Sequence, residues 1–226
     1  MYLEKQEKRV TALLIIFVLI AAAVLGSTYY RHSVVPDIIG RELSKEEQEE
    51  IIRNNSSLTD YVRLSPHADF PRKDDIKVIT IHYMEGDFTL DHIGRTFSYT
   101  DRNASANYGI DSNGNVGLFV EEKNASRASH DEKNDSQAVT IEVANDEIGG
   151  EWHVSDQAFE TLVDLCADIC FRNNIEKLVY TGDVRGNFTC HKNISKDTEC
   201  PGPYLESKMG GIAEKVNERL GQLKGD

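Results

Sequence analysis

The sequence predicts an α/β domain that follows a short apolar segment at the N-terminus. Two runs rich in β-branched residues, "KVITIHYM" (residues 77–84) and "QAVTIEVAN" (residues 137–145), are typical of buried strands. Between the second run and the C-terminus, "SDQAFETLVDLCADICFRN" (residues 155–173) repeats apolar side chains at helical spacing. Strands and helices that follow one another in this way favour the α/β class.

The N-terminal segment, residues 10–26, contains neither a charged residue nor a proline. Its length is near the lower limit for a bilayer-spanning helix, and the cations of Lys5, Lys8 and Arg9 precede it. We therefore expect a cytoplasmic N-terminus (residues 1–9) and a transmembrane signal anchor (residues 10–28), which make this a single-pass membrane protein. The alternative is a signal peptide that is cleaved, which makes the protein secreted. Either way, the rest of the chain is exported.

Residues 29–57 are expected to form an extracytoplasmic stalk. Within them, "SKEEQEEIIRNN" predicts a helix that begins at Ser44, with Glu47 completing a capping box. The apolar residues of this stretch are too few for a core of its own. A proline-bearing polar loop follows at "SPHADFPRKDD", and the globular domain is expected over residues 58–221.

Each element of that domain has its own signal. Asn113 and Gly114 predict a hairpin turn, and alternation along the second strand places Thr140 and Glu142 on one face. Ser155 caps the amphipathic helix. The expected order is a strand ending at His82, a strand–turn–strand over residues 107–122, a strand over 137–145, a helix over 155–173, a strand over 177–182, and a helix over 204–220 that Gly210 and Gly211 weaken.

Composition limits the classes of partner. The chain has 226 residues, 39% of them hydrophobic, which suits one ordinary globular domain with an additional segment. Its formal net charge is −13, and no basic stripe runs along it. Nucleic acid is therefore not expected as a partner.

The four cysteines raise the question of disulfides in an exported chain. Cys166 and Cys170 lie on the apolar face of one helix, where they are expected to be small core residues. If Cys190 and His191 belong to an extended stretch, their side chains point to opposite faces, so Cys190 faces the packing when His191 faces a site. A disulfide between Cys190 and Cys200, in a purely structural exported domain, is one alternative.

Cys200 stands directly before Pro-Gly-Pro, which predicts a tight turn, and His191 lies nine positions upstream. His82 ends a buried strand, where a polar side chain needs a reason. Two imidazoles and one thiolate are a set of three protein ligands for zinc that leaves the fourth position for water. The alternative for His82 is a hydrogen-bonded structural histidine.

Four motifs, "ITIHYMEG", "SANYGIDSNGNVGLFV", "VTIEVAND" and "CHKNISKDTECPGPYL", resemble those of the zinc-dependent N-acetylmuramoyl-L-alanine amidases, in the same order and spacing. This family includes prophage lysins of Gram-positive bacteria, to which the resemblance is closest, and the animal peptidoglycan recognition proteins. The resemblance runs from about residue 58 to 220. It implies a central mixed β-sheet flanked by helices, with His82, His191 and Cys200 as ligands of Zn²⁺.

The resemblance also implies a catalytic glutamate on the strand written "TIEVAND", which is Glu142. A carboxylate on a central strand needs a role or a partner, and the alternative is an ion pair with Arg127 or Lys192. Many lysins carry an oxyanion-stabilising lysine two residues before the ligand cysteine. Here that position is Thr198, whose hydroxyl donates a hydrogen bond but brings no charge. Lys196 is a nearby substitute.

Three further residues are expected to contact substrate. Some family members have a tyrosine in the segment that matches "ASANYGI", where this chain has Ala106 followed by Asn107. Tyr83, directly after the first histidine ligand, could take over that tyrosine's role. His130 falls where many relatives have a histidine lining the groove, and the alternative is a solvated loop residue.

The expected function is hydrolysis of the amide bond between N-acetylmuramic acid and L-alanine in peptidoglycan. Glu142 takes the proton of the attacking water and passes it to the leaving amine, while Thr198 shares the oxyanion with the metal. Peptidoglycan and the membrane are the expected partners of a monomeric enzyme. The alternative is a module that binds muropeptides without cutting them, whose members typically lack the ligand cysteine.

Overall fold

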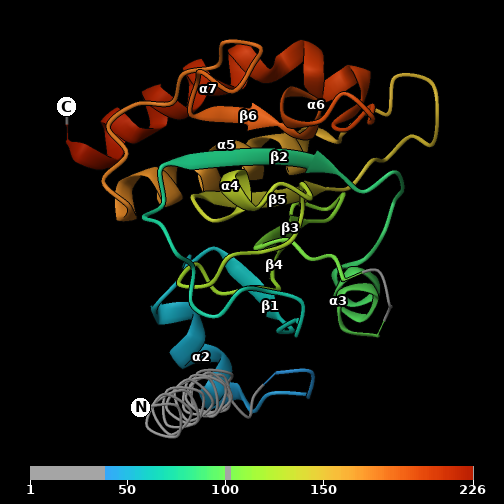
Figure 1. Cartoon of the computed structure of the whole chain (residues 1–226), viewed down its shortest axis with the longest axis vertical. Helices are drawn as coiled ribbons and strands as arrows, with labels where there is room; N and C mark the ends of the chain where they lie inside the picture. The colour runs from blue at the N-terminus through green and yellow to red at the C-terminus, as the bar shows by residue number, and fades with distance from the viewer. Residues whose placement is uncertain (1–38, 100–102, 226) are drawn as a thin grey trace, which may run out of the picture. The chain divides into compact units, whose positions relative to one another are not determined.

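The computed structural model describes residues 39–99 and 103–225, which are built around a six-stranded β-sheet (Figure 1). The strands lie in the order β1-β4-β3-β5-β2-β6. Among the named strands only β3 and β4 pair in antiparallel fashion, so the sheet is mixed, as the resemblance to the amidase family implies. The strands are β1 (Thr59–Val62), β2 (Val78–Tyr83), β3 (Tyr108–Ile110), β4 (Val116–Leu118), β5 (Ala138–Val143) and β6 (Phe188–Cys190).

Strands β2 and β5 lie side by side within the sheet, which explains their nearly continuous apolar sequences. The threonine hydroxyls within them are matched to buried partners. The Thr80 hydroxyl lies 3.0 Å from that of Thr189 on β6, and the Thr140 hydroxyl lies 2.7 Å from that of Ser126. Because these pairs satisfy each other, the two strands stay buried without an unpaired hydroxyl.

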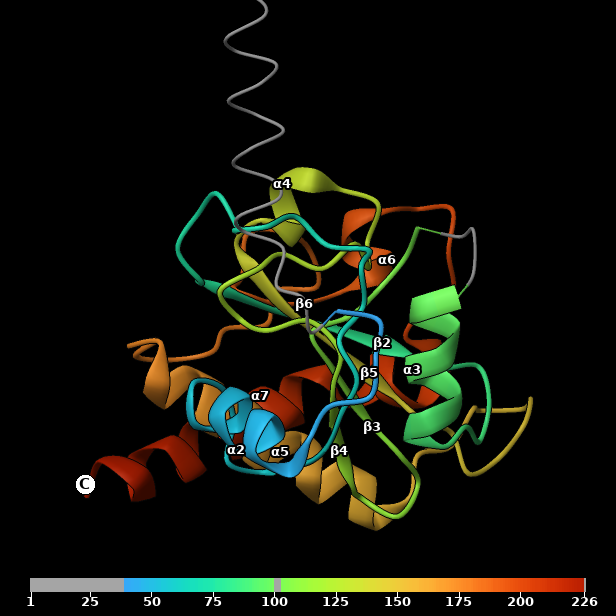
Figure 2. The same ribbon diagram turned by 90° about the horizontal axis from the view of Figure 1, so that it is seen from below.

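Helices cover both faces of the sheet. Figures 1 and 2 show α5 and α7 side by side on one face, with α4 and α6 toward the other. The larger hydrophobic cluster joins α5 and α7 to the strands. A smaller cluster packs Leu90, Ile93 and Phe97 of α3 against Phe119. The helices are α2 (Lys45–Arg53), α3 (Leu90–Tyr99), α4 (Glu132–Asp135), α5 (Asp156–Arg172), α6 (His191–Ile194) and α7 (Gly202–Lys224).

Helix α2 does not behave as part of an isolated stalk. Its N-terminus has the predicted capping box, in which Ser44 and Glu47 satisfy each other's backbone amides. However, Ile51 is buried in the larger hydrophobic cluster, and the Asn55 side chain accepts a hydrogen bond from the Glu122 backbone amide. Residues 39–57 therefore lie against the domain, because their few apolar side chains share its core.

The strand expected over residues 177–182 is not formed, and the edge strand is β6, a few residues later. The reason is a side chain on α7. Asn217 accepts a hydrogen bond from the Leu178 amide and donates one to the Leu178 carbonyl, so it takes the place of a neighbouring strand. Val179, which a sheet would bury, is 44% exposed.

The predicted transmembrane anchor, residues 10–28, lies outside the described residues. Among residues 39–99 and 103–225, none of the helices is both long enough and apolar enough to cross a bilayer.

Candidate metal centre and its groove

His82 occupies the carboxyl end of β2 and is 2% exposed. Strand β2 pairs with β5 in register, so that His82 lies directly opposite Glu142. Paired residues of neighbouring strands project from the same face of a sheet. The backbone therefore brings an imidazole and a carboxylate together at one edge of the sheet.

His191 and Cys200 come from the segment between β6 and α7. Strand β6 ends at Cys190, whose side chain is fully buried as predicted, and α6 begins at His191. The Lys192 amide donates a hydrogen bond of 2.9 Å to the Cys200 carbonyl, which ties the two ligand-bearing segments together. The expected tight turn after Cys200 is the start of α7, with a cis peptide bond between Cys200 and Pro201.

Position 202 requires glycine, both for its backbone conformation and for the space around it. Its φ is +79°, and a Cβ built on it would lie 2.9 Å from the ring of Tyr83. A side chain there would strain the backbone and push against the ring. The first turn of α7 thus sits directly on β2, and this contact holds Cys200 beside His82.

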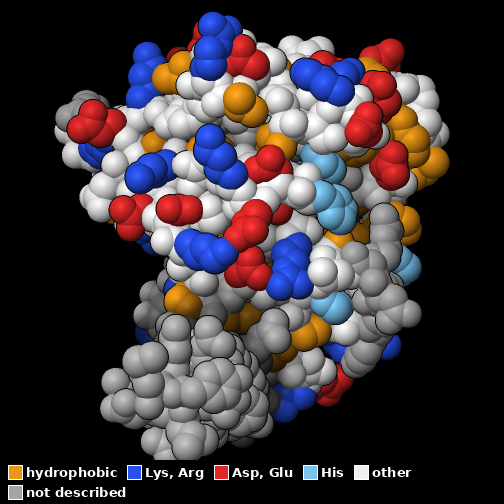
Figure 3. Space-filling view, in the orientation of Figure 1, with side chains coloured by type: hydrophobic (Ala, Val, Ile, Leu, Met, Phe, Trp, Pro, Cys, Tyr) orange, Lys and Arg blue, Asp and Glu red, His pale blue; other side chains and the backbone are white. Residues whose placement is uncertain are grey.

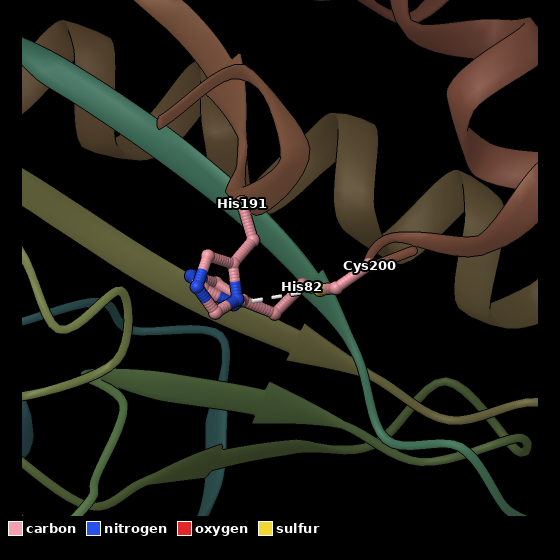
Figure 4. Close-up of side chains that lie close together, drawn as sticks. All are labelled: His82, His191 and Cys200. Atoms are coloured by element: carbon pink, nitrogen blue, oxygen red, sulfur yellow. Dashed lines mark hydrogen bonds between the residues drawn. The ribbon is translucent and has the colours of Figure 1, made fainter. Parts of the chain in front are cut away.

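The three predicted ligands converge (Figure 4). Their potential ligand atoms all lie within 4.8 Å of one another, and Cys200 Sγ is 3.6 Å from His82 Nδ1. Two such atoms on one tetrahedral zinc ion are about 3.5 Å apart, given the usual Zn–N and Zn–S bond lengths. Donor set, spacing and burial all fit a zinc ion.

Burial sets the protonation of these groups in the absence of metal. It lowers the pKa of His82 to about 3, with smaller contributions from His191 and His130. It also lowers the pKa of His191 and raises that of the Cys200 thiol. The Tyr83 backbone amide opposes the change at Cys200, because a hydrogen bond to sulfur favours the thiolate. Both imidazoles are thus neutral at pH 7, as metal ligands must be.

Glu142 is half-buried and lines the same groove as the three ligands. The two cations considered as its alternative partners contact other carboxylates. Arg127 pairs with Asp69 at 2.8 Å, and Lys192 contacts Glu199 and Glu206 at 3.0 and 3.1 Å. The carboxylate of Glu142 thus belongs to the wall of the groove that also contains the three predicted ligands.

Thr198 also lines the groove, and its hydroxyl oxygen accepts a 3.1 Å hydrogen bond from the Cys200 amide. This bond orients the side chain and leaves the hydroxyl proton available for donation. Lys196, the nearby cation, instead donates a hydrogen bond of 3.4 Å from its ammonium group to the Lys192 carbonyl, and it does not line the groove.

The three residues expected to contact substrate separate into two groups. Tyr83 and His130 line the groove. Asn107 does not, because it is fully buried inside the sheet. Its amide nitrogen donates to the Val120 and Asn124 carbonyls, and its oxygen accepts from the Thr140 amide. The expectation for Asn107 is therefore wrong, since its hydrogen-bonding groups serve the fold.

The groove has a volume of about 370 Å³ and extends from the cluster to α3. Histidine side chains reach the surface near the carboxyl end of β2, on a face where acidic and basic residues are interspersed (Figure 3). The wall on the α3 side includes Phe88 and His92, whose rings stack with centroids 4.6 Å apart. Sequence reasoning missed this wall, and the apolar repeat at Leu90, Ile93 and Phe97 was its available signal.

The cysteines are all free thiols, which removes the alternative of a disulfide between Cys190 and Cys200. Cys166 and Cys170 are fully buried in the larger hydrophobic cluster, as predicted.

Two histidines and one cysteine beside a carboxylate match the ligand sets of catalytic zinc sites, which keep a fourth position open for water. Comparison of the sequence with protein families makes the assignment specific. The N-acetylmuramoyl-L-alanine amidase family (Amidase_2) matches residues 72–203, more than half of the chain. The chain belongs to this family. No curated protein matches the sequence significantly.

Solved structures share the fold. PlyL has a TM-score of 0.55 at 18% identity, covering 69% of this chain and 95% of its own. AmpD has a TM-score of 0.55 at 16% identity, covering 70% and 95% respectively. The hydrolase AmiA of Staphylococcus aureus, solved in complex with its ligand, has a TM-score of 0.55 at 14% identity and covers 81% and 94%. The chain therefore spans the domain shared by these proteins.

Proposed function

We propose that this protein is a zinc-dependent amidase that hydrolyses the bond between N-acetylmuramic acid and L-alanine in peptidoglycan. Its family membership supports a peptidoglycan amidase. The observation that carries the proposal is the meeting of three potential zinc ligands with the carboxylate of Glu142, at the wall of one groove.

His82, His191 and Cys200 are the residues that would hold the ion. When bound, zinc supplies a Lewis acid that acidifies water and polarises the scissile carbonyl. The burial of His82 keeps its imidazole neutral, and the hydrogen bond from the Tyr83 amide offsets part of the rise that burial causes in the pKa of the Cys200 thiol. The chain thus holds the imidazoles neutral before the ion arrives, whereas the Cys200 thiol would release its proton on binding it.

Glu142 acts as the general base. Its register opposite His82 places the carboxylate beside the ligands, where it accepts the proton of the attacking water. It then returns that proton to the amine of L-alanine as the bond to the lactyl carbonyl breaks. Thr198 donates its hydroxyl proton to the oxygen on which negative charge develops, while its own oxygen is fixed by the Cys200 amide.

The test is to incubate the purified full chain with isolated peptidoglycan and to count newly exposed alanine amino groups, with zinc content measured on the same sample. We expect stoichiometric zinc and steady release of alanine N-termini. A protein that holds zinc and binds muropeptides but releases none would support the binding module instead. New reducing sugar ends without alanine amino groups would contradict the proposed bond.

A further inference from the structure

Glu85 places a second carboxylate in the groove, on a residue that the reaction described above does not use. It follows His82 by three positions and lines the groove together with Thr198 and Cys200. Its side chain is exposed to solvent. An ionised carboxylate at this position is accessible to any ligand that lies along the groove.

The backbone at Glu85 is in the left-handed region, with φ at +53°. For a residue with a side chain, this conformation costs about 1 kcal/mol, which glycine would avoid. Strained residues of this kind cluster at sites where the strain serves a purpose. At Glu85 this backbone conformation directs the carboxylate into the groove.

The carboxylate is also held in place. The Tyr83 hydroxyl donates a 2.8 Å hydrogen bond to Glu85 Oε1. Tyr83 is 8% exposed, and its ring meets the Trp152 ring edge-on with centroids 5.7 Å apart. Gly202 packs closely against the same ring. Because its donor cannot move freely, Glu85 has one oxygen fixed and the other open to a ligand.

The charges of the groove favour a cationic ligand beyond the metal cluster. Among the described residues that line it, the carboxylates are those of Glu85 and Glu142, and neither lysine nor arginine occurs. A carboxylate of the substrate that approaches Glu85 would meet a like charge, whereas an ammonium would form a charge-assisted hydrogen bond.

We propose that Glu85, positioned by Tyr83, binds a primary ammonium group of the peptidoglycan stem peptide. This inference rests on the proposed function. Two ammonium groups share this chemistry: the side-chain amine of a diamino acid at the third position of the stem, and the α-amine of L-alanine that cleavage releases. The first makes Glu85 a residue that determines substrate specificity, and the second makes it a residue that holds the product.

The test compares two synthetic N-acetylmuramoyl-tripeptides whose third residue is lysine, with its side-chain amine either free or acetylated. If Glu85 binds the side-chain ammonium, the full-length enzyme has a lower KM for the free amine, by about twofold to fivefold for an exposed ion pair. Glu85→Gln abolishes this preference and leaves the acetylated substrate unaffected. Tyr83→Phe reduces the preference without abolishing it.

Asp87→Asn is the matched control. Asp87 is an exposed carboxylate two residues further on, and it accepts a hydrogen bond from Ser112 outside the groove lining. This variant should keep the preference of the wild type. If Glu85→Gln behaves like the wild type with both substrates, the specificity role is refuted.

Product inhibition tests the second ammonium group, the α-amine of the released L-alanine. If Glu85 holds the released α-ammonium, Glu85→Gln weakens inhibition by the free tripeptide, whether or not its side-chain amine is acetylated. Unchanged inhibition together with unchanged KM values would overturn the proposal in both forms. If the wild type cleaves neither substrate, the proposed function fails, and calorimetric binding of the two tripeptides to wild type and Glu85→Gln still decides the role of Glu85.

Discussion

His82 on β2 and Glu142 on β5 are direct partners in a parallel pair of central strands. This register places a buried imidazole and a half-buried carboxylate on the same face at the same edge of the sheet. A shift of one residue would turn either side chain to the opposite face. The neighbouring strand contacts thus fix the distance between a proposed metal ligand and a proposed base more firmly than a loop could.

Replacing a proposed ligand should remove the metal. We expect Cys200→Ser and His191→Ala to lose stoichiometric zinc, because two remaining ligands and water cannot match a three-ligand site. Elemental analysis of the purified chains measures this directly. His153→Gln is the control, since His153 is paired with Asp146 away from the cluster. Full zinc content in Cys200→Ser would show that the ligand assignment is wrong.

Replacing the proposed base should separate catalysis from metal binding. We expect Glu142→Gln to keep its zinc and to lower kcat by about 10²–10⁴-fold, the usual contribution of general acid–base catalysis. Alanine amino groups released per minute report kcat. Glu147→Gln, which changes an exposed glutamate on the loop after β5, should retain wild-type activity. Activity within a few-fold of wild type in Glu142→Gln would assign the base elsewhere.

The sequence predicted the metal cluster better than the rest of the groove. The convergence of His82, His191 and Cys200 was predicted from residues of ligand type near a strand end and a turn, and above all from the resemblance of their motifs to those of the amidase family. Asn107 was misread, because only the folded sheet shows that its amide is fully used by Val120, Asn124 and Thr140. Hydrogen bonds between distant segments leave no local pattern.

Two errors in the fold have related causes. Residues 177–182 have the composition of a strand, but the side chain of Asn217 satisfies the backbone at Leu178. Helix α3 was overlooked although it forms a wall of the groove. Its sequence contains Gly94, a poor helix former, at a point where a Cβ would lie 2.8 Å from the Arg63 side chain. In both cases a tertiary contact overrides local propensity.

Removing the hydroxyl of Thr198 should lower kcat. Thr198→Val removes the proposed hydrogen bond to the developing oxyanion, and we expect kcat to fall about tenfold, less than for a charged or fully buried donor. KM should change little, because the bond strengthens only as charge develops. Thr198→Ser keeps the hydroxyl and should keep most of the activity. Equal losses in the two variants would indicate a packing role, and zinc content must be measured in both.

The metal-free protein should lose stability in acid. The folded-state pKa of His82 is lowered by burial to about 3 from the ordinary histidine value of 6.5, so the unfolded chain binds more protons between these values. The free energy of unfolding therefore falls as the pH drops from about 6.5 toward 3. Denaturant melts of the chelated protein across this range measure the effect. His82→Gln should show a shallower decline, and an identical decline would exclude His82 as its source.

The location of the enzyme depends on residues 10–28, which we propose to be an uncleaved membrane anchor that leaves the domain outside the cell. The support is the uncharged, proline-free run over residues 10–26 after Lys5, Lys8 and Arg9. We expect the full chain with a C-terminal tag to stay in the membrane fraction after carbonate extraction, and external protease to remove the tag from intact spheroplasts. As a control, deletion of residues 1–28 should leave the tag inside the cell and protected. Release of the full chain into the medium with a new N-terminus would identify a cleaved signal peptide. If the tag of the full chain were protected from external protease, export would be contradicted altogether.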